Sequence, residues 1–167
     1  MPDPVVGILV GSESDRERMQ ACMDELTARG IGHEFEVRSA HRTPDAVDEL
    51  TGREIEHEFE VRSAHRDPLA VAEYASSARE RGLKVLICGA GLAAALPGVV
   101  AAHTDLPVIG VPLRSSKSVL DGLDALLSIV QMPPGVPVAC VGVDNARNAA
   151  VLAARILGVS ERPATIS

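Results

Sequence analysis

Aromatic residues are scarce in this chain of 167 residues: they make up 2% of it, and Trp is absent. Proteins that bind single-stranded nucleic acid stack its bases on exposed aromatic rings, so this composition disfavours such a platform. The formal net charge of −7 at pH 7 also opposes binding to a long phosphate polyanion. We therefore expect no nucleic-acid partner, and we expect any bound phosphate to be small.

Cysteine is rare as well. The three Cys residues lack a Cys-x-x-Cys spacing, which disfavours a disulfide framework or a zinc knuckle. The five His residues form no metal-ligand pattern, and His33 and His57 alternate with Glu as on a solvated strand face, so we expect no metal. No uncharged apolar run approaches the roughly 20 residues of a membrane span, and no basic region precedes an apolar one at the N-terminus. These absences predict a cytoplasmic protein without a membrane partner.

What the sequence does contain is an alternation of short apolar runs with helical patterns. Residues 5–10 form a continuous apolar run, and apolar residues then recur at helical spacing until Gly30. Further strands are expected at 84–88, 107–111 and 137–141, and further helices at 69–81, 92–103, 118–130 and 146–157. This order predicts an α/β fold in which helices cover both faces of a parallel sheet, a three-layer αβα sandwich. Such sheets bind ligands at the carboxyl ends of their strands.

The first strand-to-helix turn is Gly-Ser-Glu-Ser-Asp, residues 11–15. A turn that opens a helix presents free N–H groups, so Ser12 and its neighbours could hold a phosphate. An alternative needs no ligand, because Ser14 and Glu17 have the Ser-x-x-Glu spacing of a capping box. The residues alone leave both interpretations open.

A second candidate turn occurs twice. Residues 33–42, His-Glu-Phe-Glu-Val-Arg-Ser-Ala-His-Arg, recur without change at 57–66, and similar residues flank both copies. Two copies are too few for a repeat array, so this is a tandem duplication of 24 residues. Each copy predicts a strand followed by a Ser-Ala-His-Arg turn. In that turn His41 or His65 could transfer a proton, and Arg42 or Arg66 could bind an anion. A capped surface loop is the alternative.

A third candidate, Gly89-Ala90-Gly91 and the residues up to Ala94, fits the dinucleotide pattern Gly-x-Gly-x-x-Ala. A dinucleotide fold would place this pattern after its first strand, with an acidic residue about 20 positions later. Here the pattern follows a later strand, and the next strand leads to Arg114 rather than to a carboxylate. NAD binding is therefore disfavoured, whereas close approach of this backbone to another ligand or to a neighbouring subunit is not.

Taken together, these motifs and several later ones resemble the PurE family, over nearly the whole chain from Val5 to Leu157. The later motifs are Leu-Pro-Gly at 96–98, Leu-Pro-Val-Ile-Gly-Val-Pro at 106–112, Gly-Leu-Asp at 122–124 and Ser-Ile-Val-Gln-Met-Pro at 128–133. The resemblance implies a flavodoxin-like sandwich and a homo-octamer with active sites at subunit junctions. It also implies a mutase of purine biosynthesis that needs no cofactor. This reaction moves a carboxyl group of N5-carboxyaminoimidazole ribonucleotide from the exocyclic nitrogen to ring carbon 4.

The same resemblance implies roles for individual residues. Ser12 would hold the phosphate, Asp15 the ribose hydroxyls, and the His of one Ser-Ala-His-Arg turn would be the general acid and base. The remaining implied substrate-binding residues are Arg66 or Arg42, Ser63 or Ser39, and Gly89, Ala90 and Gly91. The second copy leads into a full helix and the first into a helix that Gly52 shortens, so His65 and Arg66 are preferred.

Two departures from the family pattern matter. Ala95 stands where the family has a pocket histidine, which affects the side of the site that would handle the carboxylate. The chain also ends soon after Leu157, without the family's longer C-terminal helix, so a weakened octamer is expected. We predict one domain over residues 1–160, with 33–56 as the duplicated insert, and a short tail at 161–167. The alternatives are a carboxylase that uses CO2 directly and an oligomer that binds a nucleotide without turnover.

Overall fold

The computed structural model describes residues 3–37, 64–65 and 67–160. The described helices and strands follow the order β1 (Val6–Val10), η1 (Glu13–Asp15), α1 (Arg16–Ala28), β2 (His33–Val37), α3 (Pro68–Ser77), β3 (Val85–Gly91), α4 (Leu96–Ala102), β4 (Val108–Leu113), α5 (Leu123–Val130), β5 (Ala139–Cys140) and α6 (Ala146–Ser160). This is the expected alternation of strand and helix. Among the described residues, no helix has the length and apolar character needed to cross a bilayer.

The five strands form one parallel sheet in the order β2-β1-β3-β4-β5. This is the order of flavodoxin-like folds, in which β1 and β3 flank the point where the direction of winding reverses. All residues of β1 and β4 are buried, and so are the first six of β3. These strands are therefore continuous apolar runs rather than alternating ones, because helices cover both faces.

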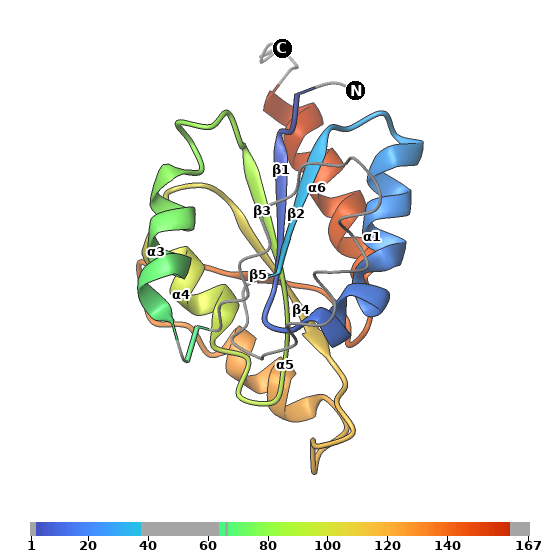
Figure 1. The fold of residues 1–167 in the computed structure, drawn as a ribbon, viewed down its shortest axis with the longest axis vertical. Coiled ribbons are helices and arrows are strands. Elements are labelled where there is room, and N and C mark those ends of the chain that lie inside the picture. Colours follow the sequence, from blue (N-terminus) through green and yellow to red (C-terminus); the bar gives the residue numbers. More distant parts are fainter. Residues whose placement is uncertain (1–2, 38–63, 66, 161–167) are drawn as a thin grey trace, which may run out of the picture.

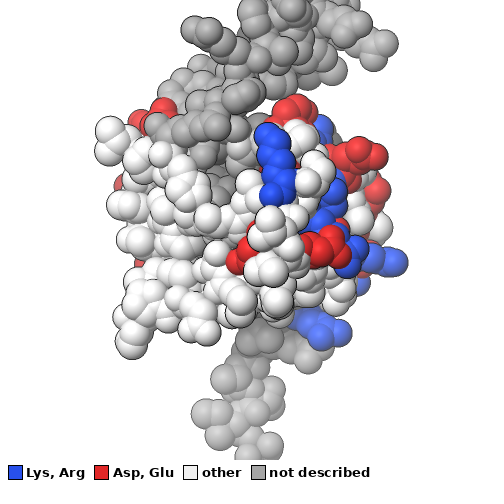
Figure 2. All heavy atoms as spheres, turned by 90° about the horizontal axis from the view of Figure 1, so that it is seen from below, with Lys and Arg blue, Asp and Glu red and all other residues white. Residues whose placement is uncertain are grey.

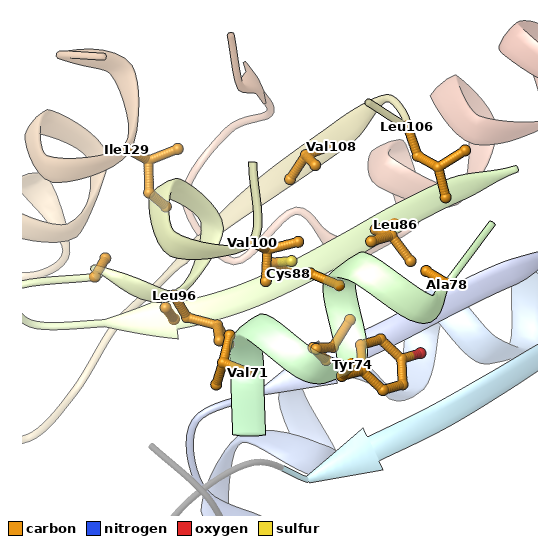
Figure 3. Close-up of a cluster of buried hydrophobic side chains, with 14 of the residues drawn as sticks. Val71, Tyr74, Ala78, Leu86, Cys88, Leu96, Val100, Leu106, Val108 and Ile129 are labelled. Carbon is orange, nitrogen blue, oxygen red and sulfur yellow. The ribbon is translucent and has the colours of Figure 1, made fainter. Parts of the chain in front are cut away.

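Helices cover both faces of the sheet (Figure 1). Each face carries its own hydrophobic core. On one face, α1 and α6 pack against the sheet through Met19, Cys22 and Leu26 and through small residues of α6, Ala149 and Ala153. On the other face lie α3, α4 and α5, which contribute Val71, Tyr74, Leu96, Val100 and Ile129 to a second cluster around Leu86 and Cys88 (Figure 3). The predicted αβα sandwich is confirmed.

Several predicted boundaries differ from the observed ones. The helix predicted at 92–103 begins only at Leu96, because Leu92 has a left-handed φ of 54° that no helix accommodates. The helix predicted at 118–130 begins at Leu123, after Gly122 with a φ of 91°. The last strand, predicted at 137–141, contains only Ala139–Cys140. In each case a local turn overrides the apolar periodicity.

The first copy of the repeat supplies the edge strand. Strand β2, His33–Val37, pairs in parallel with β1 from Val6 to Val10. The predicted solvated face is only partly correct, because Glu34 accepts hydrogen bonds from the Tyr74 hydroxyl and, at 3.3 Å, from Arg81. The second copy, in contrast, leads directly into α3. In the described structure, the edge strand β2 therefore comes from the first copy, whereas α3 is the helix that follows the second copy in the sequence.

Candidate active site at the carboxyl edge of the sheet

The turn between β1 and α1 is built around Ser12. Its hydroxyl accepts a hydrogen bond from Ser14 N at 3.3 Å and shares another, 2.8 Å long, with Ser14 Oγ. Ser12 is thus the N-cap of the short helix η1, and α1 begins after Asp15, whose side chain makes no capping hydrogen bond. The predicted capping box of Ser14 and Glu17 is therefore wrong. The reason is that η1 intervenes, so Ser14 lies inside a helical turn rather than before one.

Asp15 is half-buried at the end of η1. Loss of hydration raises the pKa of its carboxyl from 3.8 to about 6, although the charge of Arg18 opposes the shift. Below this pKa the group is a hydrogen-bond donor as well as an acceptor, and above it the group is an acceptor for hydroxyls. The carboxyl is therefore a polar group held at the site at a cost in stability, which is typical of functional positions.

Arg18, whose charge acts on Asp15, is connected by hydrogen bonds to two residues that the sequence did not single out as site residues, Asp144 and Arg114. Arg18 Nη1 donates to Asp144 Oδ2 at 3.0 Å, and the other oxygen of Asp144 accepts from the backbone N–H of Arg114, also at 3.0 Å. Asp144, which lies in the loop after β5, therefore connects the first turn of α1 to the residue that follows β4. Their positions in the sequence could have indicated them, because Arg114 directly follows β4 and Asp144 stands a few residues after β5.

His65 lies two residues before Asp67, the N-cap of α3, whose carboxylate accepts from Ala70 N at 3.1 Å. Since α3 returns the chain to the beginning of β3, its N-terminus lies at the carboxyl edge of the sheet, the same edge as Ser12 and Asp15 (Figure 1). Ala64 packs on the core beneath α3, and the His65 side chain is exposed. The structure thus brings His65 and the Ser12–Asp15 turn to one edge.

The other predicted site residues of the two Ser-Ala-His-Arg turns, namely Ser39, His41, Arg42, Ser63 and Arg66, lie outside the described residues. Their predicted roles, like that of His65, stay predictions.

The glycine run Gly89-Ala90-Gly91 lies inside β3 and pairs with β4, not in a strand-to-helix turn. A Cβ atom at position 89 would come within 2.8 Å of Met19 Sδ, and one at position 91 within 3.0 Å of the Leu113 carbonyl oxygen. These glycines therefore allow α1 and the end of β4 to pack closely on β3. Gly91 is half-exposed at the carboxyl edge, and its contact with a substrate remains a prediction.

Charge is unevenly distributed over this edge. Seen from the carboxyl ends of the strands, acidic and basic side chains gather on the side of α1 and α6, whereas the described surface on the side of α3 and α4 is largely uncharged (Figure 2). The charged side includes the Arg16–Glu13 pair at 2.6 Å and the Arg18–Asp144 pair. A ligand at this edge would thus meet charged side chains of both signs on one side and uncharged residues on the other.

Neither a metal site nor a cysteine nucleophile emerges from the described part of the chain. It contains no group of three or more His, Cys, Asp or Glu residues that could hold a metal ion. All three cysteines are free thiols, as predicted for a chain without a disulfide framework. Burial raises the pKa of Cys22 to about 12 and that of Cys88 further, so neither forms the thiolate that a nucleophile requires.

Comparison with known proteins gives consistent similarities. Residues 5–53 and 45–165 match the model of the AIR carboxylase family. N5-carboxyaminoimidazole ribonucleotide mutases from Pyrococcus horikoshii and Thermotoga maritima are 47% and 48% identical to this chain over 156 residues, which cover 93% of it and 73% and 76% of the two relatives. The crystal structure of Treponema denticola PurE has a TM-score of 0.65 at 30% identity, and the match covers 95% of this chain and 82% of that one.

Proposed function

This chain belongs to the AIR carboxylase family, and on that premise we propose that it is an N5-carboxyaminoimidazole ribonucleotide mutase. The observation that carries the proposal is the match of 93% of the chain to relatives with that name, at 47–48% identity. The substrate is a small phosphorylated sugar, which agrees with the expectation that this acidic chain binds phosphate locally.

We propose that substrate binds across the carboxyl edge, between the Ser12–Asp15 turn and the N-terminus of α3. The Ser12 hydroxyl and the arginine of a Ser-Ala-His-Arg turn hold the phosphate, because a guanidinium offers paired donors to its oxygens. The Asp15 carboxylate accepts hydrogen bonds from the ribose hydroxyls. The half-exposed backbone at Gly91 faces the base from the end of β3.

The reaction breaks the bond between the exocyclic nitrogen and the carboxyl carbon, and the nitrogen takes up a proton from the imidazolium of His65. The released CO2 stays in the site, ring carbon 4 attacks it, and the same imidazole removes the proton from that carbon. Protons and electrons balance, so the isomerisation requires no cofactor. Holding CO2 beside the ring raises its effective concentration, which can lower the barrier by several kcal/mol.

His65 is preferred over His41 because it directly precedes α3. Pro68 begins α3 and Asp67 caps it, so the backbone beside His65 is tied to a well-packed helix. His41 carries the same side chain, and the single-site variants below separate the two. Ala95, at the N-cap of α4, lies at the same edge in place of the family's pocket histidine. The carboxylate of the substrate is therefore handled by other groups in this chain.

We also propose a cytoplasmic homo-octamer. An exposed apolar surface supports association: the five side chains involved lie on α5 and just before it, and they are 46–92% exposed. They are Val119, Leu120, Leu123, Leu127 and Val130. Exposed apolar side chains gathered in one segment are typical of contacts between subunits. Since α5 begins at the carboxyl edge, a neighbour docked there would lie beside the site.

The proposal is tested by supplying N5-carboxyaminoimidazole ribonucleotide without ATP and following formation of the 4-carboxy isomer by chromatography. Turnover is the expected result. Faster carboxylation of aminoimidazole ribonucleotide with bicarbonate would instead make this chain a direct carboxylase, and a raised melting temperature without either product would make it a binding protein.

Paired variants locate the acid and base. We expect His65→Asn to lower kcat by about 10²–10⁴-fold, as for loss of a general acid–base group, while the nucleotide still raises the melting temperature. We expect His41→Asn to leave kcat within a few-fold of the parent value. The opposite pattern would assign the chemistry to the first copy of the repeat.

A further inference from the structure

We infer that the β2 position of the sheet accepts either copy of the repeat, so that the strand 57–61 can replace His33–Val37 beside β1. The chain then has two isomeric forms that differ in which copy is paired. The inference concerns folding and does not depend on the proposed function.

The contacts that hold β2 in place involve only residues that both copies share. Val6 to Val10 pair with the backbone of residues 33–37. Phe35 packs against the core beneath α1, and the Arg16 guanidinium lies 4.4 Å from its ring centroid. Glu34 accepts hydrogen bonds from Tyr74 and Arg81 of the α3 segment. The equivalent residues 57–61 are His-Glu-Phe-Glu-Val, identical at all five positions, so they can make each of these contacts.

The residues just before the strand also have counterparts. Ile31 packs partly against the core under α1, and Gly32 accepts hydrogen bonds from Val5 N and Val6 N through its carbonyl oxygen. The second copy has Ile55 at the first position and Glu56 at the second. A backbone carbonyl serves equally from Glu, and Gly32 does not have the positive φ that would require glycine.

Chain connectivity favours neither form strongly. With residues 33–37 paired, four residues join α1 to the strand and thirty join the strand to α3. With residues 57–61 paired, these connections would contain twenty-eight and six residues. Each form therefore has one short and one long connection. Because the entropy of closing a loop depends only on the logarithm of its length, the two costs are similar. Identical contacts and similar loops give two forms of similar free energy.

The duplicated strand also makes the two forms indistinguishable by deletion. Removal of residues 33–56 and removal of residues 43–66 produce the same amino-acid sequence, because residues 33–42 and 57–66 are identical. A deletion therefore cannot show which copy is surplus, and the prediction that 33–56 is the insert describes only one of several equivalent choices. The two forms must be resolved in the intact chain.

The intact chain is suited to ¹⁹F NMR, because its only two Phe residues, Phe35 and Phe59, occupy equivalent positions of the two copies. In protein labelled with 4-fluorophenylalanine, we expect each ring to give two signals, one from the paired and one from the unpaired position, connected by exchange cross-peaks. The deletion variant lacking 33–56 has a single Phe and defines the shift of the paired position. Arg16→Ala should move only that signal, because Arg16 lies over the paired ring.

Matched substitutions of the two Phe residues show whether the second copy can take the β2 position. In Phe35→Ala the remaining label, at position 59, should move to the paired shift with little loss of melting temperature, whereas the double variant Phe35→Ala/Phe59→Ala should melt at a much lower temperature. Phe59→Ala should leave the signal of Phe35 at the paired shift. If the label at position 59 keeps its unpaired shift in Phe35→Ala, or if that variant does not fold, the second copy cannot take the place of the first and the inference is overturned.

Discussion

Replacing Asp15 by Asn should stabilise the protein at neutral pH while weakening substrate binding. The pKa of the Asp15 carboxyl is raised from 3.8 to about 6, chiefly by loss of hydration. A pKa difference of about two units corresponds to about 3 kcal/mol, an upper value because the group is only partly buried. The folded state binds this proton more tightly than the unfolded state does. The carboxyl therefore contributes most to stability below pH 3.8, and that contribution is lost as the pH rises through about 6.

The measurement is urea unfolding followed by circular dichroism, at several pH values between 4 and 8, for the parent and Asp15→Asn. We expect the variant to be more stable by about 1–3 kcal/mol at pH 7.5, and we expect the difference to approach zero near pH 4, where the parent carboxyl is protonated. Asp24→Asn, an exposed position on α1, removes the same formal charge and is the matched control. It should show no gain that depends on pH. A constant difference across the pH range, or a less stable Asp15→Asn at pH 7.5, would refute the argument from burial.

In the mutase assay, the KM of Asp15→Asn should rise because the ribose hydroxyls lose a charged acceptor.

Two further substitutions test the packing that supports the site. Leu92→Gly should raise the free energy of unfolding by about 0.5–1 kcal/mol, because Leu92 has a left-handed φ of 54° and is 39% exposed, whereas Leu92→Ala should bring no such gain. Equal melting temperatures for the Gly and Ala variants would contradict this. Gly110→Ala should destabilise the protein by about 1–3 kcal/mol, since the added Cβ would come within 2.5 Å of Ile129 Cγ2, and the same change should cost less in an Ile129→Ala background, which lacks that methyl group. Chemical denaturation measures both effects, and an unchanged Gly110→Ala would show that α5 can shift away from β4.

The central part of the sheet could be predicted from the sequence because β1, β3 and β4 are continuous apolar runs, whereas β2 alternates polar and apolar residues. Such runs at 5–10, 84–88 and 107–111 indicate strands buried on both faces, and β1, β3 and β4 are buried in this way. The candidate site is placed at the carboxyl edge by the same reasoning, since the carboxyl ends of parallel strands meet there, and its substrate contacts stay predictions.

The boundaries and the electrostatic contacts could not be predicted, because they depend on geometry that periodicity does not encode. The left-handed conformation of Leu92, which delays the start of α4, leaves no trace in an apolar pattern. The contact between Arg18 and Asp144 spans 126 positions and exists only because α1 and the loop after β5 meet over the end of β4. The sequence pattern points to Ser14 as the capping residue. In the structure Ser12 is the N-cap, because the short helix η1 precedes α1.

The location of the duplication at a sheet edge explains how the chain tolerates it. Among the described strands, β2 has a neighbour on one side only, so twenty-four additional residues can leave or enter there without parting any other described pair of strands. The same event within β3 would have separated β1 from β4 and broken both cores. An outermost strand is thus a place where a gene can acquire a second copy of a strand and of the turn that follows it while the rest of the fold is retained.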